Sequence, residues 1–116
     1  IRKLFGGAMR QAGFLAAAAI YALDNNVERL AEDHQRAKKI GKVLKSCSFV
    51  QSVEPIETNI VIFYLNNTIK ENSFVAKMVE KDIHFISMGD GKLRMVTHLD
   101  FTQKMLDKLI VELQSF

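Results

Sequence analysis

Apolar and polar residues recur along this chain with two periods, which predict where helices and strands lie. Residues 8–23 are rich in alanine and leucine and apolar almost all round, which predicts a helix buried on several sides. The polar run Asp24-Asn25-Asn26 can cap a second helix, because these side chains accept hydrogen bonds from free backbone N–H groups. In that second helix, apolar residues recur every three or four positions from Val27 to Leu44. We therefore expect two consecutive helices before the first strand.

Two strands should follow these helices. Residues 49–53 form a weak strand pattern, closed by Pro55, and residues 59–65 form a strong one, because isoleucine, valine, phenylalanine and tyrosine favour extended backbone. A third helix is predicted from Asn72 or Ser73 to Lys81, with apolar residues along one side.

The last part of the chain reads as a hairpin and a final helix. Residues 83–88 and 92–98 are strand-like and are separated by Gly89-Asp90-Gly91, a short glycine-containing loop typical of antiparallel hairpins. Asp100, followed three positions later by Gln103, is expected to cap a helix whose apolar residues share one face.

The resulting order, α-α-β-β-α-β-β-α, indicates an α+β fold. The strands are joined too closely for parallel crossovers, so a largely antiparallel sheet of about four strands is expected. Helices should pack on one face of this sheet to form a two-layer sandwich, preceded by a connecting helix.

Composition limits the classes of function that fit. The 116 residues are 48% apolar, enough to bury the core of one domain. A net charge of +3, with basic and acidic residues mixed along the chain, disfavours nucleic-acid binding. The apolar run at residues 14–20 is too short to span a bilayer, and no signal peptide precedes it, so a soluble, cytoplasmic protein without a membrane partner is expected. Its one cysteine and three isolated histidines lack metal-ligand spacing, so no metal site is predicted.

Arg94 is the leading candidate for a binding residue. Side chains alternate along a strand, so Arg94 should share one face with Lys92, Val96 and His98, and the intervening residues should lie on the other face. An arginine between apolar neighbours is costly to desolvate unless an anion pairs with it, and its planar fork matches a carboxylate. Strand pattern alone also fits an arginine on a solvated sheet face.

A second candidate lies near the start of the chain. Gly6-Gly7-Ala8-Met9-Arg10 resembles a glycine-rich turn entering a helix, where free backbone N–H groups can favour an anion. Two glycines alone are a weak signal.

Two motifs nevertheless carry a family resemblance. The run K-L-F-G-G-A-M-R-Q-A-G at residues 3–13 and the run R-M-V-T-H-L-D at residues 94–100 resemble the C-terminal part of the low-specificity L-threonine aldolases. The similarity to that family extends from Ala16 to Asp33. It includes the segments A-A-A-x-Y-A-L and V-E-R-L-A-E-D-H, the second of which ends at His34. Ala8 departs from the pattern, since the family has a third glycine there. The resemblance fades between Ser46 and Lys92.

The resemblance implies a pyridoxal 5'-phosphate (PLP) enzyme with the aspartate-aminotransferase fold, fold type I. Residues 1–23 would then be the end of the large cofactor domain and a connecting helix, and residues 24–116 the small C-terminal domain. Arg94 would bind the α-carboxylate of the amino-acid substrate, and Arg10 and Lys3 would lie near the cofactor phosphate. The lysine that bonds the cofactor is expected upstream of Ile1, so no catalytic residue is assigned within the chain.

The resemblance implies cleavage of L-threonine or L-allo-threonine to glycine and acetaldehyde. It also implies a homotetramer, the assembly that the family forms. The 116 residues alone are expected to be inactive. One alternative stays open, a noncatalytic amino-acid-binding or oligomerisation module. Another PLP lyase or an aminotransferase with the same small domain is disfavoured by the M-R-Q-A-G and V-T-H-L-D pair.

Overall fold

The computed structural model describes residue 1 and residues 3–116, which form two compact units, Ile1–Leu30 and Ala31–Phe116. The first unit contains turns followed by helix α1 (Gly13–Asn26). The predicted helix start at residue 8 is wrong, because Gln11 has a φ of +49°, which lies outside the right-handed helical region. The helix also continues through Asn26, so the polar run at residues 24–26 belongs to α1 and does not cap the next helix.

Helix α1 does not bury its apolar side chains within its own unit. None of its residues is buried, and Phe14, for example, keeps 81% of its surface exposed. The expectation of a helix buried on several sides is thus not met there, because the short turns around α1 supply no core for it to pack against.

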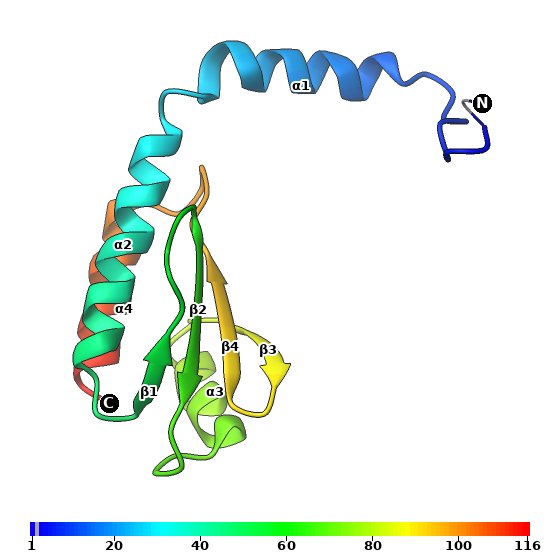
Figure 1. The fold of residues 1–116 in the computed structure, drawn as a ribbon. Coiled ribbons are helices and arrows are strands. Elements are labelled where there is room, and N and C mark those ends of the chain that lie inside the picture. The colour runs from blue at the N-terminus through cyan, green and yellow to red at the C-terminus, as the bar shows by residue number, and fades with distance from the viewer. Residues whose placement is uncertain (2) are drawn as a thin grey trace. The chain divides into compact units, whose positions relative to one another are not determined.

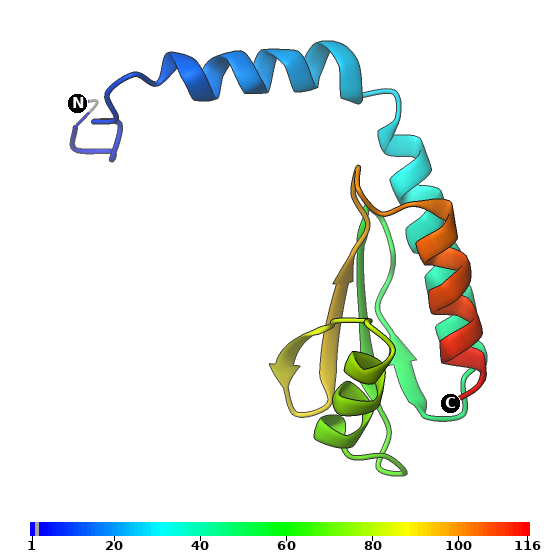
Figure 2. The ribbon, with the colours of Figure 1, turned by 180° about the vertical axis from the view of Figure 1, so that it is seen from behind.

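The second unit is an α+β sandwich, as the sequence predicted (Figures 1 and 2). Its elements are α2 (Leu30–Ser46), β1 (Val50–Val53), β2 (Ile60–Leu65), α3 (Glu71–Glu80), β3 (Ile86–Gly89), β4 (Lys92–Val96) and α4 (Gln103–Gln114). The four strands form an antiparallel sheet in the order β1-β2-β4-β3. Helices α2, α3 and α4 cover one face of this sheet, with α2 beside α4. We call this the covered face and the other the open face.

An aromatic cluster on the covered face holds the layers together. Phe74 of α3 is fully buried at its centre. Its ring centroid lies 4.9 Å from that of Phe116, 5.2 Å from that of Phe49 and 5.5 Å from that of Phe85. Such tilted ring contacts stabilise the core in addition to the apolar surface that the rings remove from water. Alternate residues of β2 and β4, including Phe63 and Leu93, point into the same core.

Predicted boundaries in the second half of the chain also need correction, and β4 ends at Val96, two residues earlier than predicted. Strand β3 starts at Ile86, three residues later than predicted, because the end of α3 is tied back by the Ile83 N–H bond to the Met78 carbonyl and Asp82 takes a φ of +59°. The N-cap of α4 is Thr102, whose hydroxyl accepts a hydrogen bond from the Met105 N–H at 3.3 Å. Asp100 is not the cap. The predicted hairpin is confirmed, and β3 and β4 pair antiparallel across Asp90 and Gly91.

Across the described residues, no helix is both long and apolar enough to cross a bilayer.

Candidate functional site

Arg94 lies on the open face of the sheet, as the alternation predicted. Its flanking residue Leu93 is fully buried on the covered face, whereas Arg94 is half-buried. In the backbone register, Arg94 lies opposite Ile62 of β2 and Ile86 of β3. Its side chain forms no hydrogen bond or ion pair with any residue that the structure describes. The guanidinium donors are therefore available to an anion from outside the described chain.

Apolar residues flank Arg94 on this face, except on the side of Lys92. Ile62 and Ile86 are its cross-strand partners, and Val96 is two residues along β4. Apolar side chains beside a guanidinium exclude water and lower the local dielectric, which strengthens its attraction for a carboxylate. The arrangement suits an ion pair whose anion is a ligand.

Lys92, on the same face as Arg94, has its charge compensated within the chain. Its Nζ lies 3.1 Å from Oε1 of Glu54 and 5.2 Å from the ring centroid of Tyr64. The Tyr64 hydroxyl donates a hydrogen bond of 2.7 Å to the same Glu54 oxygen. This hydrogen bond and the contact with Lys92 lower the pKa of Glu54, and the contacts with Tyr64 and Glu54 raise the pKa of Lys92. Sequence reasoning missed Glu54, which follows β1 outside any periodic pattern.

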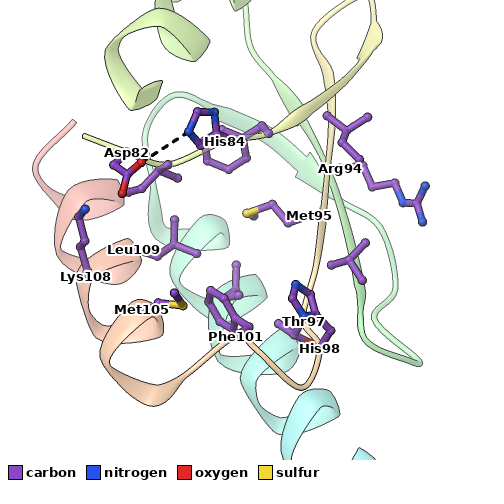
Figure 3. A pocket seen from close by; sticks show the side chains of 15 residues that line it. Asp82, His84, Arg94, Met95, Thr97, His98, Phe101, Met105, Lys108 and Leu109 are labelled. Atoms are coloured by element: carbon purple, nitrogen blue, oxygen red, sulfur yellow. Dashed lines mark ion pairs between the residues drawn. The ribbon is translucent and has the colours of Figure 1, made fainter. Parts of the chain in front are cut away.

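A pocket of about 430 Å³ lies beside β4, between α4 and the segment that leads into β3 (Figure 3). Phe101, Met105 and Leu109 line it on the side of α4. Arg94 borders this pocket, but its guanidinium points away from Met95, Met105 and Leu109. The pocket is therefore distinct from the place where Arg94 could bind an anion.

Lys3 and Arg10 both lie exposed in turns of the unit Ile1–Leu30, whereas Arg94 belongs to the unit Ala31–Phe116. The turn that contains Gly6 is sharp, since Gly6 has a φ of +78° and its carbonyl accepts the Ala8 N–H at 2.9 Å. Because α1 begins only at Gly13, Arg10 precedes the helix and does not lie on its surface. The side chains of Lys3 and Arg10 are thus exposed and accessible to a ligand.

The histidines are dispersed. His98 is exposed just after β4, and its Nδ1 accepts a hydrogen bond of 3.3 Å from the Asp100 N–H, which shapes the turn toward α4. His84 lies 3.7 Å from Asp82 at the surface, and His34 is half-buried on α2. Within the described residues, no three His, Cys, Asp or Glu side chains gather in a way that could hold a metal ion.

Comparison with known proteins relates this geometry to a family. The model of the beta-eliminating lyase family matches residues 1–68, more than half of the chain. The chain belongs to that family. It is 35% identical to the low specificity L-threonine aldolase of Escherichia coli (strain K12), over 99% of the chain and 33% of that protein. It is 30% identical to the low-specificity L-threonine aldolase 1 of Arabidopsis thaliana, over 88% of the chain and 29% of that protein. This beta-eliminating lyase chain thus spans about a third of the length of these curated relatives.

Solved structures share its fold. One is the cystine C-S lyase C-DES in complex with cysteine persulfide, with a TM-score of 0.67, 19% identity, and coverage of 90% of this chain and 29% of that chain. Another is the histidinol-phosphate aminotransferase from Clostridium acetobutylicum, with a TM-score of 0.57, 20% identity, and coverage of 70% and 25%. At such identities the likeness concerns the fold alone. Together, the relatives and the family match confirm the resemblance that the sequence motifs indicated.

Proposed function

We propose that the protein containing this chain is a PLP-dependent threonine aldolase that cleaves L-threonine or L-allo-threonine to glycine and acetaldehyde. The support is the set of relatives bearing that name, which match the chain nearly end to end. A mutant of C-DES with glycine covalently linked to its PLP cofactor shares the fold, with a TM-score of 0.67. PLP would act as an electron sink for the pair left on Cα when the Cα–Cβ bond breaks.

In this proposal, Arg94 binds the α-carboxylate of the amino acid. The observation that carries the proposal is that Arg94, half-buried on the open face between Ile62 and Ile86, pairs with no side chain that the structure describes. Two parallel hydrogen bonds from a guanidinium to a carboxylate fix direction as well as distance. Held at its carboxylate, the substrate can be oriented so that the bond to be broken stands perpendicular to the cofactor ring.

The other unit would contribute positive charge. Residues 1–23 would belong to the end of the cofactor domain and its connecting helix, and residues 24–116 to the small domain. Lys3 and Arg10, exposed beside the open turn at Gly6, suit the neighbourhood of a phosphate, although Ala8 replaces a glycine of the family pattern. The lysine that bonds PLP would come from outside this chain. The assembly we propose is a homotetramer in the cytoplasm.

Replacing Arg94 tests the proposal. In the full-length protein, Arg94→Ala should raise KM for L-threonine by about 10- to 100-fold, since a charge-assisted hydrogen bond contributes about 1.5–3 kcal/mol. The visible absorption of bound PLP should stay unchanged, because Arg94 is assigned to the substrate and not to the cofactor. Arg94→Lys should be intermediate, because it keeps the charge but loses the planar fork.

Lys104→Ala serves as the matched control, since it removes an exposed cation from α4. It should leave KM unchanged. An Arg94→Ala variant with the KM of the unmodified protein would contradict the carboxylate role.

A further inference from the structure

Two motif segments that are far apart in the sequence meet at the end of β4. Thr97, from the R-M-V-T-H-L-D run, is 1% exposed, and Asp33, from the V-E-R-L-A-E-D-H run, is 2% exposed. The Thr97 hydroxyl donates a hydrogen bond of 2.8 Å to the main-chain carbonyl of Asp33 in α2. A buried hydroxyl without a partner would cost free energy. Moving the strand end away from α2 would leave the Thr97 hydroxyl without its partner, so this hydrogen bond holds the strand end against the helix.

Asn59 fastens the same strand end to β2. Its side-chain amide donates a hydrogen bond of 2.7 Å to the Thr97 carbonyl, and its own carbonyl accepts the Thr97 N–H at 3.0 Å. Thr97 is therefore held through its side chain, its N–H and its carbonyl. We call this arrangement of Thr97, Asn59 and the Asp33 carbonyl the Thr97 latch.

The helix side of the latch is itself braced. The buried Asp33 carboxylate forms an ion pair of 3.6 Å with Arg36, one turn further along α2. The carbonyl that accepts from Thr97 thus belongs to a fixed turn of the helix.

The latch lies where β4 has the least other support. Arg94 is the last residue of β4 that pairs on both sides, opposite Ile62 and Ile86. Met95 and Val96, which follow it, are paired with β2 but lie beyond the β3 register. Strand ends with few backbone partners open readily, and such opening would spread toward Arg94.

The position of a guanidinium depends strongly on the strand that carries it. A slip of one residue in register would move Arg94 to the covered face, and smaller changes in strand twist would spoil two parallel hydrogen bonds. A binding group must be held within about 0.5 Å of its productive position. The end of β4 therefore needs an anchor close to Arg94.

We propose that Thr97, acting through this latch, is a positioning residue that holds Arg94 in the geometry that binds a carboxylate. This inference rests on the proposed function, because it presumes that Arg94 binds the carboxylate of the amino acid.

The test compares two ligands in the full-length protein with PLP. Glycine carries a carboxylate and methylamine does not, and binding of each is followed by the change in the visible absorption of bound PLP. Thr97→Val keeps the shape of threonine but removes the hydroxyl, whereas Thr97→Ser keeps the hydroxyl. Thr97→Val should weaken glycine binding about three- to tenfold, the range that one lost hydrogen bond spans. Its methylamine affinity should stay within about twofold, and Thr97→Ser should bind glycine nearly as the unmodified protein does.

A purely structural role predicts a different pattern. A folded Thr97→Val variant that binds glycine with unchanged affinity would overturn the proposal. So would equal losses for glycine and methylamine, since these would show general damage to the site.

Asn59→Ala provides a second, milder variant if Thr97→Val does not fold. It removes the 2.7 Å hydrogen bond to the Thr97 carbonyl and leaves the buried hydroxyl in place. Hydrogen exchange of the Thr97 amide, measured without PLP, should become faster, and glycine binding should weaken selectively. Faster exchange with unchanged glycine binding would overturn the proposal.

Arg94→Ala separates failure of this inference from failure of the proposed function. If Arg94→Ala leaves glycine binding unchanged, the carboxylate role itself fails. If Arg94→Ala weakens glycine binding and neither latch variant does, only the positioning role of Thr97 fails.

Discussion

Lys92 and Arg94 stand two residues apart on one face of β4, but they differ in whether the described chain supplies an anion. Glu54 lies 3.1 Å from the Lys92 ammonium, and Tyr64 donates a hydrogen bond to that same glutamate. No corresponding carboxylate of the described residues pairs with Arg94. If Arg94 binds a ligand carboxylate, as we propose, the pairing with Glu54 would keep Lys92 from competing for that carboxylate.

The pKa of Glu54 tests this network. Because the Tyr64 hydrogen bond is the first cause of its lowered pKa and Lys92 the second, Tyr64→Phe and Lys92→Met should each raise it toward the ordinary value. Carboxyl-carbon NMR during a pH titration measures the change, with Lys104→Met as a control that should leave it unaltered. A folded-state pKa below the unfolded one stabilises the protein above the unfolded pKa, and this stabilisation is lost as pH falls through the folded pKa. An unaltered Glu54 titration in Tyr64→Phe would contradict the network.

The faces of individual residues could be predicted, but their distant partners could not. Period-two alternation placed Arg94 and Thr97 on opposite faces, and the structure agrees, with Thr97 directly after the end of β4. Nothing in the local pattern indicated that Glu54 reaches Lys92 or that Asn59 and Asp33 hold Thr97. Those contacts depend on the pairing of segments that are distant in sequence.

At the scale of elements, apolar periodicity predicted the presence and type of each helix and strand more accurately than the residues at which it begins and ends. Apolar periodicity reports on the middle of an element, whereas the ends depend on single backbone conformations and caps. Gln11, with its positive φ, delays the start of α1, and Thr102 replaces Asp100 as the cap of α4.

Removing the cap of α4 should destabilise the unit. Thr102→Ala should lower the free energy of unfolding by about 1 kcal/mol, because the Met105 N–H loses its partner. Thr102→Ser should retain most of the stability. Denaturant titration of the chain measures both, and a larger loss from Asp100→Ala than from Thr102→Ala would contradict this assignment.

For the whole molecule, the sequence predicted the α+β class and the antiparallel pairing, because short connections forbid parallel crossovers. It did not predict the strand order β1-β2-β4-β3, in which β4 lies between β2 and β3. That order follows from how apolar faces of the whole chain come together, and local periods do not encode it. The same holds for Phe74, whose central place in the core depends on rings from four other segments.

Phe74 should dominate the stability of the unit. Phe74→Ala should lower the free energy of unfolding by about 3–5 kcal/mol, because it leaves a cavity among the surrounding rings. Phe116→Ala should cost less, since Phe116 keeps 37% of its surface exposed. Denaturant titration of both variants makes the comparison, and a larger loss at Phe116 would show that the core is centred elsewhere.

The central claim, that this chain serves a PLP enzyme acting on an amino acid, is tested most directly by the visible spectrum. The full-length protein is mixed with PLP and titrated with glycine, the amino-acid product of the proposed cleavage. We predict an absorption band of protein-bound PLP that changes as glycine binds, with saturation that Arg94→Ala shifts to higher glycine concentration. Absence of such a band would contradict the aldolase proposal and would favour a noncatalytic amino-acid-binding or oligomerisation module.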